Sequence, residues 1–177
     1  NPANDQEAAE NYYQLSTTAN TTEAIFERFF STDDAGRSNF EPNQDHGPNG
    51  YHQWGGNTPT QQLVDEYRMA DGSEFSWDNS EHASDPYADR DPRFYGTVLY
   101  DGAPWRERPA DAEQFDEDDV VQTFAELELP NGNTVAGVDT RESPIESWNG
   151  TKSGYYMKKF VQKVSPRNRP QAPDSWI

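Results

Sequence analysis

The sequence predicts a loop-rich segment of a larger fold, built from short helices and small β-hairpins. Leu, Ile, Val and Phe together supply only 25 of the 177 residues, and the formal net charge is −18. This combination is typical of chains with too few apolar side chains for a core of their own. Aromatic residues nevertheless make up 13% of the chain, and each can bury a large area. We therefore expect residues 1–177 to pack mainly through aromatic rings, as part of a single domain that is incomplete at both ends.

A helix and a strand are the first expected elements. Residues 5–15 are good helix formers, and Ala8, Tyr12 and Leu15 recur at the spacing of one helix face. This face is expected to carry the apolar contacts of the helix. Residues 24–30 are rich in Phe and other residues that favour strands, so we expect a mostly buried strand there.

A long loop is expected over residues 31–56, where Asn, Asp, Gly and Pro are frequent and the apolar residues follow no period. Long loops in compact proteins are often functional. Next, the segment Thr58 to Gln61 has the pattern of a capping box, with Pro at the first helical position. It predicts a helix that ends before Gly72, followed by a second loop over residues 73–89.

The second half of the chain is expected to contain short strands. Asp91 followed by Pro is typical of a helix or turn start, and residues 106–119 form an acidic stretch. Asn131-Gly132 lies between two apolar segments and predicts the turn of a β-hairpin. The strands are expected at residues 96–100, 121–129, 134–138 and 155–161.

The charge excludes some classes of partner. A surface that follows phosphates needs clustered Lys and Arg, but the chain has only four Lys, and its 32 Asp and Glu outnumber its 14 Lys and Arg. Nucleic acid and bare anionic lipid are therefore not expected as ligands. The longest apolar segment is about four residues, which is too short to span a membrane.

The usual catalytic motifs are absent from the sequence. The chain contains no Cys, no G-x-S-x-G elbow and no phosphate-binding Gly loop, and its three His residues form no metal-binding pair on a helix face. Asp116 to Asp119 offers oxygen ligands of the kind that Ca²⁺ prefers, but without the spacing of an EF-hand, which favours a solvated acidic rim. We expect a non-catalytic protein without a cofactor.

Aromatic rings among Asn, Asp and Gly in the 31–56 loop suggest a ligand site instead. Pyranose rings stack on flat aromatic faces, while amides and carboxylates hold their hydroxyls. An alternative interpretation is that Trp54, Trp77 and Trp105 fill a core that lacks aliphatic residues. The candidate binding residues of this loop are Arg37, Asn39, Phe40, Asn43, Asp45, Tyr51, His52 and Trp54.

Several sequence blocks resemble a known family in composition and order. They are Asn57 to Tyr67 with Met69 to Gly72, Trp77 to Asn79, Pro86 to Tyr95, Tyr100 to Gly102, Ser153 to Phe160, and Asp174 to Ile177. Together they resemble the SusD/RagB family, the surface glycan-binding lipoproteins of Bacteroidetes, over residues 23–177. The shared motifs are typical of helix starts and turns, so the resemblance carries over no binding residue.

The resemblance implies a mainly α-helical, tetratricopeptide-like superhelix for the full protein, of which this chain would be a part. It also implies non-catalytic oligosaccharide capture at the outer membrane, with delivery to a SusC-like TonB-dependent transporter for nutrient uptake. Family members are anchored through a lipidated Cys, which would lie upstream of this Cys-free chain. The expected partners are thus an oligosaccharide, the transporter and the remainder of the polypeptide.

Two alternative functions remain open. The chain could belong to a polysaccharide-degrading enzyme, either a glycosidase or a lyase, or it could be a structural subunit that binds no sugar. The residues do not identify the glycan. An anionic glycan such as alginate would be repelled by the net charge unless Arg37 or another Arg lines the site.

Overall fold

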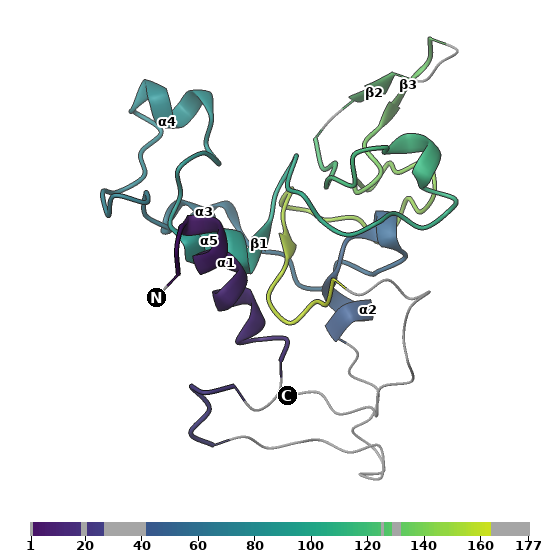
Figure 1. Ribbon diagram of the computed structural model, residues 1–177. Helices are drawn as coiled ribbons and strands as arrows, with labels where there is room; N and C mark the ends of the chain where they lie inside the picture. The colour runs from purple at the N-terminus through teal and green to yellow at the C-terminus, as the bar shows by residue number, and fades with distance from the viewer. Residues whose placement is uncertain (1, 19–20, 27–41, 125, 129–131, 164–177) are drawn as a thin grey trace.

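A computed structural model describes residues 2–18, 21–26, 42–124, 126–128 and 132–163 of the protein. The described elements are short and joined by long irregular connections (Figure 1). In chain order they are α1 (Asp5–Gln14), α2 (Pro42–His46), η1 (Asn49–Tyr51), α3 (Gln61–Asp65), α4 (Ser80–Ser84), α5 (Pro92–Thr97), β1 (Val98–Leu99), η2 (Glu113–Phe115), β2 (Glu126–Glu128), β3 (Thr134–Ala136) and β4 (Tyr156–Met157). The prediction of a loop-rich segment with short helices and small β-structure is confirmed.

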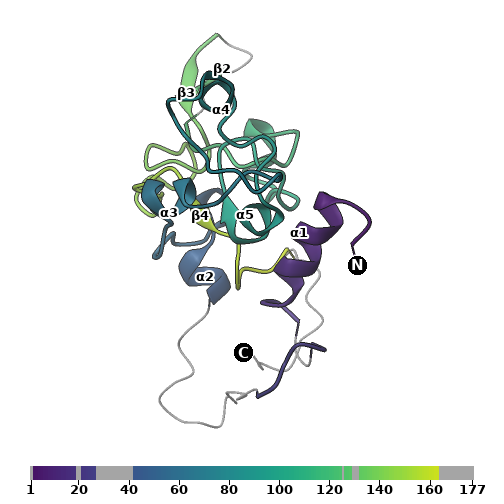
Figure 2. The same ribbon diagram turned by 90° about the vertical axis from the view of Figure 1, so that its left-hand side faces the viewer.

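A small antiparallel ladder of β1 and β4 lies at the centre of the described structure (Figures 1 and 2). Val98 and Leu99 are consecutive, so their side chains point to opposite faces of the ladder. Leu99 packs in one apolar cluster with Tyr156, whereas Val98 packs in a second cluster with Tyr155. The ladder therefore separates two small cores, which are built mostly from aromatic rings, as the composition predicted.

Helix α1 packs against α5 at the edge of this centre (Figure 1). The side chain of Asn4 caps α1 by accepting a hydrogen bond from the backbone N–H of Glu7. The predicted helix is confirmed, but its predicted face is wrong, because Ala9 and Tyr13 are buried while Leu15 is exposed. The reason is tertiary: the Tyr13 hydroxyl donates to the carbonyl oxygen of Val161 at 2.7 Å.

Gly96 allows α1 to approach α5 closely. A Cβ atom at this position would lie 2.9 Å from the carbonyl oxygen of Ala9 and 2.9 Å from the ring of Tyr12. Real side chains do not tolerate such contacts with backbone, so the helix pair requires a residue without a Cβ here.

The capping predictions are correct at one helix and wrong at another. The Asp91 side chain accepts from the N–H of Arg93 at 2.9 Å and starts α5, as predicted. Helix α3 begins two residues later than expected, because Thr60 rather than Thr58 is its N-cap and accepts from the N–H of Leu63 at 3.3 Å. It also ends at Asp65, well before Gly72.

Two further expectations for the N-terminal half are corrected. Within the described part of the expected strand 24–30, residues 24–26 are not in a strand, and Ile25 and Phe26 are exposed rather than buried. Residues 27–30 lie outside the described residues. The expected loop 31–56 is described from residue 42 onward, where it contains α2 and η1 in place of a continuous loop.

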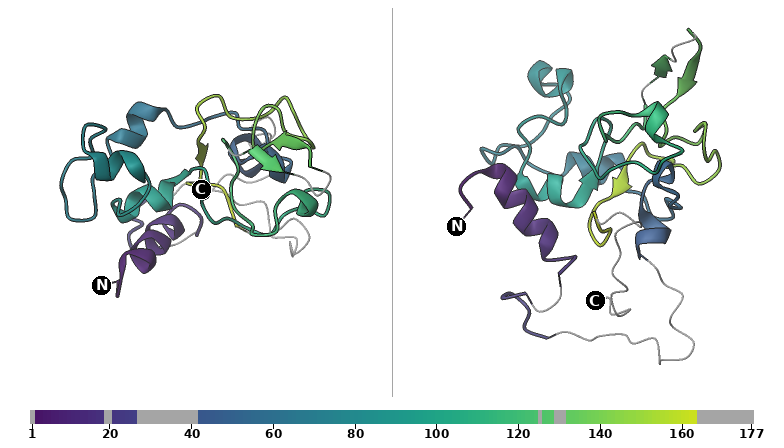
Figure 3. Two further views of the ribbon diagram at one scale, coloured as in Figure 1. Left: turned by 90° about the horizontal axis from the view of Figure 1, so that it is seen from above. Right: turned by 45° about the vertical axis from the view of Figure 1, so that its right-hand side comes forward.

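The predicted antiparallel pairing is confirmed by β2 and β3, with Leu127 opposite Val135. Residues 121–124 of the expected strand 121–129 are not in a strand, and Asn131 of the predicted turn lies outside the described residues. The β2–β3 hairpin lies at the opposite end of the molecule from α1 when seen from above (Figure 3). The expected strands 96–100 and 155–161 are reduced to β1 and β4, which pair with each other. No helix among the described residues is long and apolar enough to cross a membrane.

Candidate functional site

Residues 42–56 fold back on themselves through backbone hydrogen bonds. The N–H groups of Trp54, Gly55 and Gly56 donate to the carbonyl oxygens of Gln44, Gly47 and Asp45, at 2.7, 3.1 and 2.6 Å. Because these bonds join the two ends of the segment, its side chains are held in set positions even though α2 and η1 are short. The candidate residues of the sequence can therefore be assigned to either the inside or the surface.

Tyr51 is buried, which corrects its expected role as a surface on which a sugar ring stacks. Its side chain is 2% exposed, its hydroxyl donates to the carbonyl oxygen of Arg106 at 3.0 Å, and burial raises its pKa. The guanidinium of Arg108 lies 4.2 Å from the ring centroid. With the ring enclosed in this way, Tyr51 has no free face for a sugar.

Arg108 lies in a fully buried ion-pair cluster beneath Tyr51. Its guanidinium donates to Asp116 at 2.5 Å and to both carboxylate oxygens of Asp139 at 3.0 and 2.7 Å. Burial opposes its charge most strongly of any one cause, but the charge and hydrogen bonds of Asp139, together with Asp116, outweigh it and raise the pKa of Arg108. Asp139 also accepts from the N–H of Gly50 at 3.1 Å. The cluster thus fixes the segment that ends at Trp54.

Asn43 and Asp45 also have structural contacts. The side-chain oxygen of Asn43 is buried and accepts from the N–H of Gln162 at 2.5 Å, so Asn43 joins the segment to the end of the described chain. Asp45 is half-buried, and its backbone accepts from Gly56. The other candidates of this loop, Arg37, Asn39 and Phe40, lie outside the described residues.

His52 and Trp54 are the predicted residues that reach the surface. Trp54 is 51% exposed. The two ring nitrogens of His52 lie 3.1 Å from an oxygen of Asp111 and 3.7 Å from an oxygen of Glu146. Gln44 donates to the backbone carbonyl of His52 at 2.7 Å. The surface that carries Trp54 therefore also carries the imidazole of His52, the carboxylates of Asp111 and Glu146, and the amide of Gln44.

The structure adds Trp148, which the sequence analysis did not select. Its side chain is 72% exposed. The next residue, Asn149, touches the segment that carries Trp54, because a Cβ at Gly55 would lie 2.7 Å from the Asn149 carbonyl oxygen. The Asn149 amide in turn donates to the carboxylate of Glu146 at 2.5 Å. Nothing in the spacing of the sequence indicates that the segments carrying these two tryptophans meet.

We call this region the tryptophan surface. Trp54 and Trp148, both exposed, each directly precede one residue of the contact between Gly55 and Asn149. The polar side chains of His52, Asp111, Glu146 and Asn149 contact one another in the same region. This combination of flat apolar faces and placed polar groups suits a small polar ligand with a ring. The tryptophan surface comprises His52, Trp54, Asp111, Glu146, Trp148 and Asn149.

Comparison with protein families identifies the chain. The model of the SusD family matches residues 22–176, which is most of the sequence. The chain belongs to the SusD family. The sequence-based expectation of this family is therefore confirmed.

Solved structures with the SusD-like fold resemble this SusD-family chain. One is a SusD-like protein from Bacteroides fragilis NCTC 9343, with 20% identity and a TM-score of 0.59, which matches 94% of this chain and 31% of its own. Another is a SusD-like carbohydrate-binding protein from the same organism, with 20% identity and a TM-score of 0.50, which matches 76% of this chain and 22% of its own. The chain thus spans less than a third of either. The search of curated proteins finds no match.

The structure also shows where the acidic segment, the candidate metal ligands and the suggested core tryptophans lie. Asp116 is buried in its ion pair with Arg108, so the segment Asp116 to Asp119 is not simply a solvated rim. In the part of the SusD-family chain that the structure describes, no three His, Cys, Asp or Glu residues are grouped to hold a metal ion. Trp105 is the buried one of the three tryptophans suggested as core residues, since Trp54 and Trp77 are half exposed.

Proposed function

We propose that this SusD-family protein captures an oligosaccharide at the cell surface without cleaving it. The observation that carries the proposal is the tryptophan surface, where Trp54 and Trp148 are exposed beside Asn149, Glu146 and His52. A pyranose ring presents a face of C–H groups to an indole and a rim of hydroxyls to amides and carboxylates. The similar Bacteroides fragilis protein described as carbohydrate-binding supports the same class of ligand.

The expected affinity is modest. Stacking of a sugar on each indole contributes on the order of 1 kcal/mol, by analogy with aromatic pairs. Two such contacts and a few exposed hydrogen bonds give a dissociation constant of roughly micromolar or weaker. Weak binding suits a protein that hands its ligand onward.

The proposal also covers the cellular location and the partner of the protein. The protein is a surface-exposed lipoprotein of the outer membrane, where it delivers its glycan to a SusC-like TonB-dependent transporter. The proposal assigns the lipid anchor to a Cys outside residues 1–177, since these residues contain none. Co-purification of the transporter from detergent-solubilised outer membranes tests this part separately from ligand binding.

Calorimetric titration tests the ligand proposal, with a glycan found by array binding of the wild-type protein. Trp54→Ala and Trp148→Ala are each expected to weaken binding severalfold while leaving the melting temperature nearly unchanged. Trp77→Ala is the matched control, since Trp77 is similarly exposed at 49% but lies elsewhere and donates to Asp65. It should bind like the wild type.

Three outcomes would contradict the proposal. Binding to no glycan on the array would favour a structural subunit. Unchanged affinity with a large drop in melting temperature would show that the two indoles serve packing. Chromatographic detection of shortened glycan after incubation with the protein would favour a glycosidase or lyase.

A further inference from the structure

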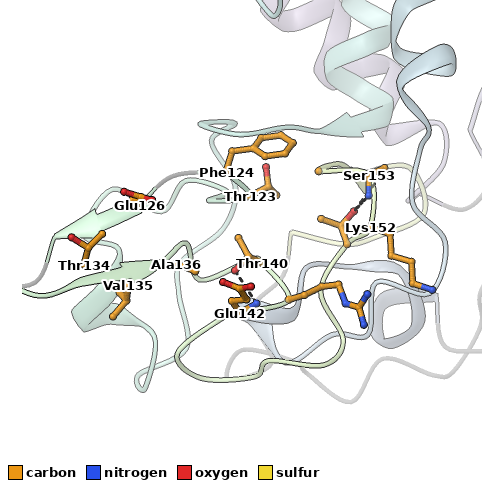
Figure 4. Close-up of a pocket in the computed structure, with 13 residues that line it drawn as sticks. Thr123, Phe124, Glu126, Thr134, Val135, Ala136, Thr140, Glu142, Lys152 and Ser153 are labelled. Carbon is orange, nitrogen blue, oxygen red and sulfur yellow. Dashed lines mark hydrogen bonds between the residues drawn. The ribbon is translucent and has the colours of Figure 1, made fainter.

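A concave region, separate from the tryptophan surface, lies between the hairpin β2–β3 and the loop over residues 140–154 (Figure 4). Its volume is about 940 Å³, which is within the range of small-ligand sites. We call it the hairpin groove. Its lining residues are Thr123, Phe124, Glu126, Thr134, Val135, Ala136, Thr140, Arg141, Glu142, Thr151, Lys152, Ser153 and Gly154, and many of them bear hydroxyls.

One aromatic ring is exposed in the hairpin groove. Phe124 is 61% exposed, although large apolar side chains are usually covered. The ring lies against Gly154, where a Cβ atom would overlap the ring atoms at 1.8 Å. Gly154 has a φ of +83°, which glycine adopts without strain. The phenyl ring therefore rests on backbone and remains partly open to a ligand.

A buried hydroxyl beside this ring has no partner. Thr123 is 6% exposed, and its Oγ1 makes no hydrogen bond within the described part of the chain. Figure 4 shows Thr123 next to Phe124 at the wall of the groove. A buried polar atom without a partner is costly, so a ligand hydroxyl that reached it would relieve that cost.

Two basic side chains of the groove are also unpaired. Among the Lys and Arg residues that the structure describes, Arg141 and Lys152 are the ones without a contact to a carboxylate, carbonyl or aromatic ring. They lie on neighbouring parts of one loop, because a Cβ at Gly150 would be 2.4 Å from the backbone nitrogen of Arg141. The groove is also lined by Glu126 and Glu142, but neither carboxylate forms an ion pair with these cations in the described structure, so Arg141 and Lys152 remain available to an anionic ligand group.

We propose that the hairpin groove binds an acidic oligosaccharide, in which Arg141 and Lys152 hold the carboxylate of a uronate unit and Phe124 contacts a sugar ring. This inference rests on the proposed glycan-binding function and adds the class of sugar. A planar guanidinium matches a carboxylate in geometry. Glu126 lies toward the hairpin, at the other end of the groove from Lys152 (Figure 4). The repulsion from the protein's other charges is screened beyond about 8 Å at physiological salt.

Affinity gel electrophoresis of the purified protein tests this inference, with polygalacturonate and alginate as probes. Carboxyl-reduced forms of both polymers keep the sugar rings and remove the charge. We expect at least one polyuronate to retard the wild-type protein, and its reduced form to bind about tenfold less, equivalent to about 1.4 kcal/mol. Retardation should weaken as salt rises from about 50 to about 500 mM, because the contact is ionic.

The variant Arg141→Gln/Lys152→Gln is expected to lose about tenfold in affinity for the retarding polymer. Phe124→Ala should lose severalfold. Arg68→Gln/Lys159→Gln is the matched control, because it removes the same charge at two exposed or half-exposed positions outside the groove. It should bind like the wild type, and circular dichroism should show the same fold for all variants.

The inference is overturned if neither polyuronate retards the protein or if the reduced polymer binds equally well. Full binding by Arg141→Gln/Lys152→Gln, or retardation by dextran sulfate alone, would overturn it too. A failure of the uronate inference can be distinguished from a failure of the proposed glycan-binding function. Binding of neutral glycans that depends on Trp54 and Trp148, without polyuronate binding, removes the groove site only, whereas binding to no glycan removes both.

Discussion

Replacement of Arg108 by Met probes the buried cluster that supports the tryptophan surface. Methionine has a similar length and keeps most of the packing, but it carries no charge and no donor. The side chains of Arg108, Asp116 and Asp139 are 0%, 1% and 0% exposed. The substitution would leave both carboxylates buried without their cation, and the carbonyl oxygen of Val120 would lose a donor at 2.5 Å.

The expected loss in the free energy of unfolding is about 3–5 kcal/mol, the usual cost of removing one partner from a buried pair. The backbone N–H groups of Gly50 and Gln122 still donate to Asp139 and limit the loss to this range. Because Gly50 is held by Asp139, we also expect the 49–54 segment to shift and glycan affinity to fall severalfold.

Urea unfolding of the purified protein, followed by tryptophan fluorescence, measures the loss. The double variant Arg108→Met/Asp139→Asn is the informative control, since it removes one of the two uncompensated charges. It should be more stable than the sum of its single variants predicts, because the two residues are coupled. A loss below about 1 kcal/mol for Arg108→Met, or strict additivity in the double variant, would refute the assigned role of the cluster.

Two further predictions concern helix caps and pH. Thr60→Ala and Asp91→Ala should each lower the free energy of unfolding by about 1 kcal/mol in urea titrations, because each removes an N-cap. Thr58→Ala, which removes no cap, should change the free energy of unfolding little. Equal effects at positions 58 and 60 would contradict the observed start of α3. Burial, and then the charge of Lys163, lower the pKa of Lys158 to about 8. Between about pH 8 and about pH 9 the unfolded chain therefore keeps a proton at Lys158 that the folded chain has lost, so Lys158 should make stability rise with pH by up to about 1.4 kcal/mol per unit. Nearer about pH 10 the buried tyrosines act in the opposite direction, because burial raises their pKa values above that of unfolded tyrosine. Lys158→Met should abolish this rise, and a rise of equal size in that variant would show that another group causes it.

The sequence by itself determined the features that depend on neighbouring residues. The Asp91 cap, the β2–β3 hairpin and the helix over residues 5–14 each follow from patterns within a few residues, because caps, tight turns and helix propensity are local effects. The ordered sequence blocks also identified the family, which the match over residues 22–176 confirms.

Only the tertiary structure decided which aromatic rings are covered and which are open. Tyr51 and Trp54 lie in the same loop and have similar surroundings in the sequence, yet Arg108 covers one while the other is exposed. The segments that carry Trp54 and Trp148 meet through the contact between Gly55 and Asn149. The covering group and the neighbouring indole come from residues far along the chain, so no local pattern could assign either ring to the core or to the surface.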